Sequence, residues 1–255
     1  MSFEQESNMH AFYVRRYPAL RNVLGSVENL FNDYSALQQQ SCEIELRLGS
    51  MVNGKFQNGV SELFFTQAIE MFKTYTGWFQ VTPIVQEVDY FFTSNSKILR
   101  YRVIDQKSDS CIFKNIILKT DLLITSDEES IINTKSNSSN RITTNGMRVQ
   151  LSNEEKIIPE NFSYIPDFVR IKQRRSFVYG NWRYDFSRVW RGKSFNEADR
   201  LFLNNSPPSS CEIEIEYIGN ANDKNYRSSS TLLSVSLLLK ALDFFPPAAL
   251  LTLIF

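Results

Sequence analysis

The sequence predicts a mainly β (α+β) fold in which about eight antiparallel strands are flanked by a few helices. Many segments alternate between polar and apolar residues, which is typical of strands with one buried face. A few others repeat apolar residues every three or four positions, as amphipathic helices do. The 255 residues are 42% hydrophobic and 13% aromatic, which is enough for a sizeable core.

Helices are predicted near both ends of the chain and after the first strand. Residues 20–37 carry one apolar stripe, and Pro18 lies just ahead of it, where a helix tolerates proline. A second helix is expected to follow Ser61, whose hydroxyl suits an N-cap. The last helix is expected over residues 231–242.

Strands are predicted where residues alternate or where β-branched and aromatic side chains gather. They are 42–48, 84–92, 97–104, 111–123, 148–152, 168–179, 181–189 and 211–217. Gly180 is expected in a tight hairpin turn between two of them. Other links are rich in Ser, Asn, Thr, Gly or Pro and are predicted to be turns or loops. These links are 51–59, 125–146, 196–210 and 219–230.

Together these elements predict a single domain over residues 1–255. It begins with an N-terminal helical arm, residues 1–40, and ends with a C-terminal helix and tail, residues 229–255. The strands between them occupy residues 41–218, with an inserted helix at 61–77 and a mobile loop at 125–146.

Composition excludes several classes of function. Lys plus Arg and Asp plus Glu both number 28, and a net charge of zero argues against a general nucleic-acid coat protein. A single histidine, His10, argues against histidine-based zinc sites and Ser-His-Asp triads. Three scattered cysteines argue against a disulfide framework and favour a reducing, intracellular compartment. Catalysis in such a chain has to depend on carboxylates, Lys, Arg and a metal ion.

No membrane-spanning segment is predicted. The N-terminus lacks the apolar core of a signal peptide. The apolar run at 244–255 contains Pro246 and Pro247 and is too short to cross a bilayer, which takes about 20 residues. We therefore expect no membrane among the partners of this chain.

Two predicted strands carry rows of glutamate. Because side chains alternate along a strand, every second residue shares one face. The charged faces are Glu43, Glu45 and Arg47 on the first strand and Glu212, Glu214 and Glu216 on the last. A solvated outer face explains either strand alone, but stacked glutamates repel one another unless a cation lies among them. Mg²⁺ and Mn²⁺ prefer such carboxylate oxygens.

Basic residues form the counterpart on other strands. They are Arg170, Lys172 and Arg174, then Arg183 beside Asp185 and Ser187, then Arg100 and Arg102, and finally Lys114 and Lys119. Acids on some strands and bases on others fit an open sheet with a wet polar face, or a closed barrel with a charged interior. A closed barrel would suit a polyanion and a metal, because hydrolysis of a terminal phosphate needs positioning and charge stabilisation.

These strands resemble those of the triphosphate tunnel metalloenzymes. The likeness is greater to the metal-dependent RNA 5′-triphosphatases of mRNA capping found in fungi, protozoa and large DNA viruses. In that family a Glu-x-Glu-x-Lys strand and a Glu-x-Glu-x-Glu strand carry the metal, and an Arg-x-Lys-x-Arg strand followed by Arg-x-Asp binds phosphate. The matching segments are Glu43-x-Glu45-x-Arg47, Glu212-x-Glu214-x-Glu216, Arg170-x-Lys172-x-Arg174 and Arg183-x-Asp185. Arg47 stands where the family motif has lysine, and it carries the same positive charge.

The resemblance implies roles for single residues. Glu154, six positions after Arg148, is implied to orient the attacking water, and Glu155 is the alternative. Arg47 and Asp185 are the other catalytic residues. The implied metal ligands are Glu43, Glu45 and Glu216, with Glu212 and Glu214 holding metal-bound water or a neighbouring cation. The implied phosphate ligands are Arg100 and its alternative Arg102, Lys119, Arg148, Arg170, Lys172, Arg174 and Arg183.

The resemblance also implies a fold and an activity. The fold is an antiparallel eight-stranded β-barrel or tunnel with a charged interior. The activity is removal of the γ-phosphate from triphosphate-ended RNA, the first step of cap formation, with Mg²⁺ or Mn²⁺ as cofactor and free NTPs as secondary substrates. An mRNA guanylyltransferase is an implied partner, although the peptide by which fungal members bind it has no match. The implied location is the nucleus, or the viral factory or virion for a viral protein.

Two other interpretations stay open. A related tunnel enzyme, such as a tripolyphosphatase or thiamine-triphosphatase, shares the pattern of acids and bases. In a non-catalytic β-barrel that binds anionic ligands, the glutamate rows would be solvated faces. Hydrolysis of tripolyphosphate alone favours the first, and tight binding of triphosphate without metal or turnover favours the second.

Overall fold

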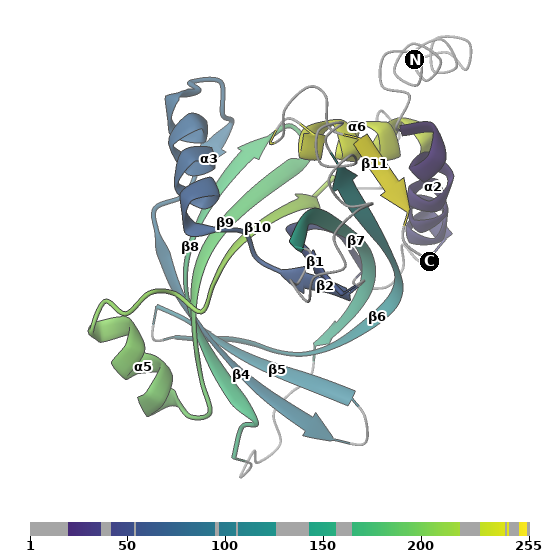
Figure 1. Ribbon diagram of the computed structural model, residues 1–255. Coiled ribbons are helices and arrows are strands. Elements are labelled where there is room, and N and C mark those ends of the chain that lie inside the picture. Colours follow the sequence, from purple (N-terminus) through teal and green to yellow (C-terminus); the bar gives the residue numbers. More distant parts are fainter. Residues whose placement is uncertain are drawn as a thin grey trace.

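The computed structural model describes residues 20–36, 42–53, 55–94, 97–105, 107–125, 143–156, 165–219, 230–242, 244 and 250–253. In this part of the chain, a strongly curved antiparallel sheet of eleven strands is flanked by four helices (Figure 1). The mainly β fold with antiparallel strands and flanking helices is therefore confirmed. Every helix in the described part is too short or too polar to span a bilayer.

The helices are α2 (Leu20–Ala36), α3 (Glu62–Thr74), α5 (Phe195–Leu203) and α6 (Ser230–Leu242). The strands are β1 (Cys42–Val52), β2 (Lys55–Asn58), β3 (Gln80–Val81), β4 (Val85–Ser94), β5 (Lys97–Ile104), β6 (Lys107–Thr125), β7 (Thr143–Lys156), β8 (Phe168–Tyr179), β9 (Trp182–Gly192), β10 (Ser210–Tyr217) and β11 (Leu250–Leu253). All eight predicted strands and all three predicted helices are present.

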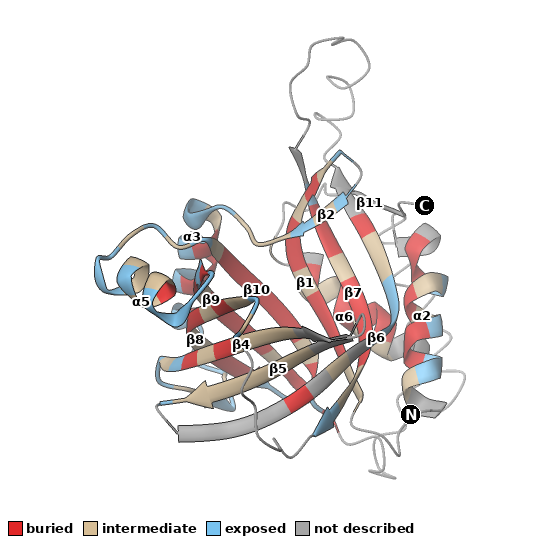
Figure 2. Cartoon of the chain, turned by 90° about the horizontal axis from the view of Figure 1, so that it is seen from below, coloured by how far each residue is buried: buried red, intermediate tan, exposed pale blue. Residues whose placement is uncertain are grey.

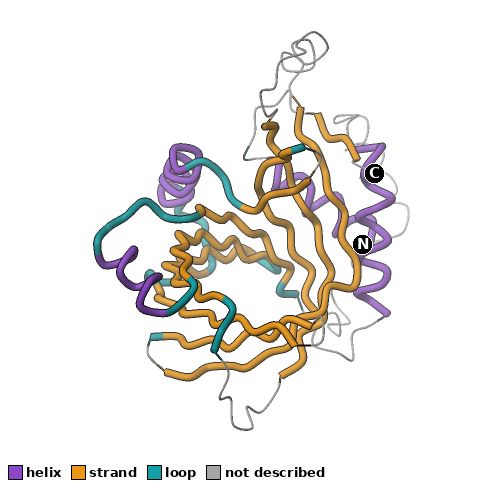
Figure 3. The backbone as a smooth tube through the Cα atoms, turned by 60° about the horizontal axis from the view of Figure 1, so that its bottom comes forward, coloured by secondary structure: helices purple, strands orange, loops and turns teal. Residues whose placement is uncertain are grey.

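The sheet order brings the two ends of the strand region together. Neighbouring strands follow the order β10-β9-β8-β4-β5-β6-β7-β1-β2, and three residue pairs also join β1 to β10. The backbone in Figure 3 bends so far that β1 and β10 lie side by side. We call the concave side of this sheet the inner face and the convex side the outer face.

The main apolar core lies on the outer face of the sheet. Ile44, Leu46 and Leu48 of β1 are fully buried there, in one cluster with Phe31 of α2 and Phe65 of α3 (Figure 2). Residues of α6 belong to the same cluster. Burying a leucine, isoleucine or phenylalanine contributes about 1.5–3 kcal/mol. This packing fixes which side of each strand faces the helices, so the alternate polar side chains must take the inner face.

A smaller apolar cluster holds α5 against the sheet. The sequence predicted a loop for these residues. Ala198 of α5 packs on Ile171 of β8, and the rings of Trp190 and Phe202 meet edge to face at 5.1 Å. Ser194 caps the helix by accepting a hydrogen bond from the backbone N–H of Glu197. The loop prediction for residues 196–210 is therefore wrong at its N-terminal half.

Several predicted links are also wrong. The link at 51–59 contains the end of β1 and the whole of β2. Thr125 and residues 143–146, predicted to be loop, extend β6 and β7. In the apolar tail, β11 pairs with β6. Residues 1–19, 126–142 and 220–229, which hold most of the N-terminal arm and two predicted loops, lie outside the described residues.

Candidate functional site

Charged side chains line the inner face of the sheet. Residues directly opposite each other in antiparallel strands lie on the same face, so the register shows which side chains belong together. This set contains every site residue predicted from the sequence. It includes Glu43, Glu45, Arg47, Glu87, Asp89, Arg100, Arg102, Lys114, Lys119, Asp121, Arg148, Glu154, Arg170, Lys172, Arg174, Arg183, Asp185, Arg191, Glu212, Glu214 and Glu216, and the uncharged Gln150 lies among them.

The ion pairs of this face reach across intervening strands. Arg100 Nη2 of β5 lies 3.1 Å from Glu154 Oε1 of β7, over β6. Arg174 Nη2 of β8 lies 3.7 Å from Glu214 Oε2 of β10, over β9. Strands two places apart in a flat sheet are separated by about 9.5 Å. Contacts of this kind are favoured by a concave face that turns long side chains toward one another.

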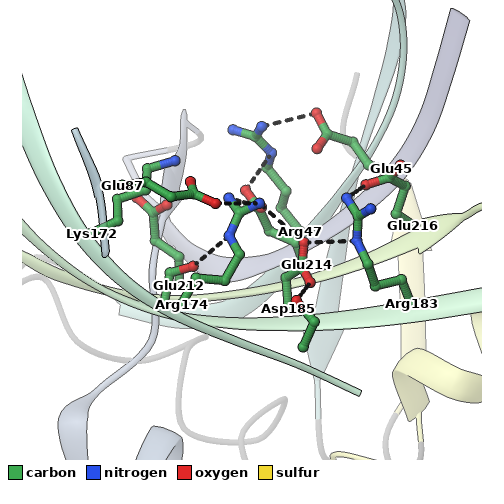
Figure 4. A network of polar contacts seen from close by, with 12 residues as sticks. Glu45, Arg47, Glu87, Lys172, Arg174, Arg183, Asp185, Glu212, Glu214 and Glu216 are labelled. Atoms are coloured by element: carbon green, nitrogen blue, oxygen red, sulfur yellow. Dashed lines mark hydrogen bonds and ion pairs between the residues drawn. The ribbon is translucent and has the colours of Figure 1, made fainter. Parts of the chain in front are cut away.

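The two glutamate strands are neighbours, and their charged residues interleave (Figure 4). Glu45 lies opposite Glu216, and Arg47 lies opposite Glu214. Arg47 Nη2 donates to Glu45 Oε1 at 2.9 Å, and its Nε lies 3.3 Å from Glu214 Oε1. Burial alone would raise the pKa of Glu214, but Arg47 and Arg174 outweigh burial and hold that pKa well below its usual range. Glu214 therefore stays ionised.

Burial and neighbouring carboxylates disfavour the ionised form of Glu216. Burial raises the pKa of Glu216 to about 8, and the pairing with Arg183 offsets only part of this effect. The nearby carboxylates of Glu43, Asp185 and Glu45 raise that pKa further. Burial also raises the pKa of Glu43. A carboxyl group that resists ionisation among other carboxylates marks a place where an added cation is favourable.

Lys114 of β6 is the cation at the centre of this acidic end. Its Nζ lies 3.0 Å from Glu43 Oε2, 3.1 Å from Glu45 Oε1 and 3.3 Å from Glu154 Oε1. Gln150 Nε2 donates to the same Glu45 oxygen at 3.0 Å. Burial lowers the pKa of Lys114, but the carboxylates of Glu45 and Glu43 outweigh burial and raise it above its ordinary value. The ammonium thus remains charged among three carboxylates.

A row of three cations follows the inner face of β8. Arg170 pairs with Glu212, and Lys172 Nζ lies 3.1 Å from Asp89 Oδ2. Burial lowers the pKa of Lys172 to about 8, against the opposing effect of Asp89. The positive charges of Arg170 and Arg174 lower it further. Such a row suits a polyanion, because its three cations share one face and can bind several phosphate oxygens at once.

Asp185 is buried and lies beside Arg174 and Arg183 (Figure 4). It accepts a hydrogen bond from Ser176 Oγ at 2.6 Å and one from Arg183 Nε at 3.1 Å. Arg174 Nη1 lies 3.3 Å from the same carboxylate. Because Asp185 is 2% exposed and its oxygens are engaged, the geometry suits a residue that orients Arg174 and Arg183 rather than one that touches a ligand.

Two predicted phosphate ligands lie on β6 and β7. Arg148 lies opposite Arg47 and forms a two-pronged pair with Asp121, at 2.6 and 2.8 Å. Lys119 lies opposite Gln150 and is exposed. Among the described residues it has no ion-pair partner. A bulge between Ile116 and Leu118 places Lys119 on the same face as Lys114, although strict alternation would put them on opposite faces.

Glu154 and Glu155, the two alternatives for orienting water, lie on opposite faces of β7. Glu154 lies opposite Lys114 on the inner face and is 14% exposed. Glu155 is exposed on the outer face. Of the two, Glu154 is the one that shares a surface with the glutamates of β1.

Sequence reasoning left several inner-face residues without a role. They are Glu87, Asp89, Asp121 and Gln150, and Lys114 was predicted only as one of the basic residues of the strands. Alternation in the predicted strand 84–92 places Glu87 and Asp89 on one face and is a signal that could have found them. The role of Lys114 depends on the pairing of β6 with β7, which the sequence alone does not reveal.

The carboxylates fit a hard divalent cation in type, though not in their present orientation. In the described part of the chain, no three Asp, Glu, His or Cys side chains are grouped so as to hold a metal ion. The oxygens of Glu43, Glu45 and Glu216 are turned toward Lys114, Arg47 and Arg183. All three are carboxylates on adjacent strands, and their oxygens are the kind of ligand that Mg²⁺ and Mn²⁺ prefer.

Comparison with known proteins gives a structural match. No protein-family model and no curated protein matches the sequence. The S. pombe RNA triphosphatase Pct1 matches with a TM-score of 0.59 and 14% identity, over 87% of this chain and 91% of that chain. Pct1 in complex with the Spt5 CTD gives 0.58 and 14%, over 87% and 92%. The triphosphatase of the Mimivirus capping enzyme gives 0.55 and 14%, over 86% and 95%. What these proteins share with this chain is the fold.

Proposed function

We propose that this protein is a metal-dependent RNA 5′-triphosphatase that removes the γ-phosphate from the 5′ end of nascent mRNA. The observation that carries the proposal is the placement of Glu45 opposite Glu216 on the same inner face as the cationic row of β8. A carboxylate cluster beside a cationic row is the arrangement that a metal and a polyphosphate require together. The fold shared with two RNA triphosphatases supports the RNA substrate.

The side chains divide into three roles under this proposal. Glu43, Glu45 and Glu216 hold Mg²⁺ or Mn²⁺, whose contribution when bound is to withdraw charge from the γ-phosphate. The cations of the inner face bind the phosphate oxygens. They are Arg100, Arg102, Lys119, Arg148, Arg170, Lys172, Arg174 and Arg183. Glu212 keeps Arg170 oriented, and Glu214 keeps Arg47 and Arg174 oriented, because these residues form ion pairs.

Glu154 orients the attacking water in this proposal. Its carboxylate accepts a hydrogen bond from Arg100 and contacts Lys114, and these contacts hold it in place to accept a hydrogen bond from water. Arg47 stabilises the charge that develops on the γ-phosphate, and Asp185 holds Arg174 and Arg183 in place.

We further propose that the chain is one domain whose eight main strands close into a tunnel, on the grounds that β1 pairs with β7 on one side and β10 on the other. The proposed partners are triphosphate-ended RNA, free NTPs as secondary substrates and an mRNA guanylyltransferase. The proposed location is the nucleus, or a viral factory or virion.

The experiment that tests the proposal measures phosphate release from triphosphate-ended RNA, ATP and inorganic tripolyphosphate. Each substrate is supplied with Mg²⁺, with Mn²⁺ and with chelator. Metal-dependent release of the γ-phosphate alone from RNA supports the proposal. Release from tripolyphosphate alone indicates a related tunnel enzyme, and tight binding of all three substrates without turnover indicates a non-catalytic receptor.

A further inference from the structure

One end of the inner face is aromatic as well as cationic. Phe91 of β4 and Phe168 of β8 lie opposite each other in the register. Their rings stack with centroids 4.4 Å apart and planes inclined by 14°. Both residues are partly exposed and share the inner face with Asp89 and Arg170. Most of the site residues on this face are charged, so a stacked aromatic pair next to Arg170 is a distinct feature of this end.

Arg191 of β9 stacks on Phe168, one ring of the aromatic pair. Its guanidinium carbon lies 4.1 Å from the centroid of the Phe168 ring, and the residue is exposed. Arg191 lies opposite Arg170, whose guanidinium carbon is 6.0 Å from the Phe91 centroid. Stacking on Phe168 holds the Arg191 guanidinium against one ring face, and its other plane and its N–H groups are left to solvent.

Arg191 also differs in charge balance from the cations further along β8. Arg170, Lys172 and Arg174 each pair with a carboxylate. Within the ranges that the structure describes, Arg191 has no ion-pair partner. Its charge is therefore available to an anionic ligand without the displacement of an acid.

Binding of inorganic polyphosphate does not require the planar groups of Arg191, Phe168 and Phe91. Phe168 precedes Lys172 by four residues on β8, which is about 13 Å along the strand. A tripolyphosphate bound to the cationic row has no planar group to place there. An RNA 5′ end has both a base that stacks on guanidinium or aromatic planes and phosphodiesters that accept hydrogen bonds from arginine.

We propose that Arg191, Phe168 and Phe91 form a subsite for the first nucleotides of single-stranded RNA, with a base stacked on the Arg191 guanidinium. This inference rests on the proposed function and extends it, because it makes RNA rather than inorganic tripolyphosphate the preferred substrate of the same site.

The test compares Arg191→Gln and Phe168→Leu with the wild-type protein. We measure kcat/KM for triphosphate-ended RNA and for tripolyphosphate, and the Kd of a 3′-labelled oligoribonucleotide with a 5′-hydroxyl end by fluorescence anisotropy. Loss of one stacking contact is expected to lower the ratio of the two kcat/KM values about tenfold and to raise the Kd by a similar factor. Thermal unfolding checks that each variant is folded.

Arg188→Gln is the matched control. Arg188 lies on the same strand, and its guanidinium carbon is 4.9 Å from the Phe65 ring, but this stack is on the outer face. The control is expected to leave the ratio and the Kd at their wild-type values. If the wild type hydrolyses RNA and the ratio is unchanged in both variants, the aromatic pair is only a cross-strand packing contact and the subsite is wrong.

The binding measurement separates failure of the subsite from failure of the proposed function. If the wild type hydrolyses neither substrate, the proposed function is wrong. The anisotropy measurement is then the only test of the subsite. Weaker RNA binding by Arg191→Gln and Phe168→Leu than by Arg188→Gln then supports the subsite, and equal Kd values overturn it.

Discussion

Lys172 holds its proton weakly, because burial and the neighbouring arginines lower its pKa to about 8. Below that pH the side chain is a cation that attracts phosphate, and above it the charge is lost. We therefore predict that kcat/KM for triphosphate-ended RNA falls as the pH rises through about 8. The measurement is the pH dependence of kcat/KM, which reports the pKa values of the protein before substrate binds.

Lys172→Arg serves as the control for this assignment, because arginine keeps its proton across the whole range. The variant is expected to lose the alkaline decline even if its rate is lower. An alkaline decline identical to that of the wild type would assign the titration to another group.

Lys114 Nζ lies within 3.3 Å of carboxylate oxygens of Glu43, Glu45 and Glu154. A metal held by Glu43 and Glu45 has to compete with this ammonium. We predict that Lys114→Met binds Mn²⁺ at least about tenfold more tightly, because two charges about 4 Å apart near a protein surface interact by up to about 4 kcal/mol. Titration calorimetry without substrate measures the Kd.

Lys73→Met, which removes a similar side chain from the exposed surface of α3, is the control for the calorimetry. It is expected to leave the Mn²⁺ affinity unchanged. Weaker binding by Lys114→Met would mean that the lysine supports the metal site instead of competing with it.

At the scale of elements, α3 holds the outer face of the strands that carry the site. The ring of Phe72 lies within 5.5 Å of those of Trp78, Tyr184, Phe186 and Phe177. We predict that Phe72→Ala lowers the free energy of unfolding by about 3–5 kcal/mol, as large-to-small changes in a core do. Chemical denaturation measures the change.

Met71→Ala, on the exposed side of α3, is expected to change the free energy of unfolding by less than about 0.5 kcal/mol. If both variants unfold alike, α3 does not pack on the sheet as described.

The sequence predicted the elements whose pattern is local. In Glu43 to Arg47 and in Glu212 to Glu216, charged residues alternate with apolar ones, so their face could be assigned without a structure. Ser61 also acts as the predicted N-cap, accepting from the backbone N–H of Phe64. Local alternation was sufficient for most of the candidate site.

What depends on pairing between distant strands could not be predicted in this way. The bulge in β6 shifts the register by one residue and brings Lys119 to the inner face. No local sequence pattern predicts this bulge. Helix α5 was missed for a different reason. Its cap Ser194 and Glu197 form a recognisable start signal, but the polar residues after Leu203 suggested a loop.

At the scale of the whole molecule, the arrangement of polarity is the central feature. The helices and the apolar core lie on the outer face of the sheet, and the charges lie on the inner face. Desolvation makes buried charges costly unless they are paired, and most of these cations already have acidic partners. The proposed function explains why the fold retains so many charges where apolar residues would be more stabilising.

The most direct test of this account is the rate of metal-dependent γ-phosphate release from triphosphate-ended RNA by Glu216→Gln. Glu70→Gln on the exposed surface of α3 is the matched control. We predict that Glu216→Gln lowers kcat by at least about a hundredfold while remaining folded, and that Glu70→Gln matches the wild type. Full activity of Glu216→Gln, or wild-type activity that survives a chelator, would contradict it.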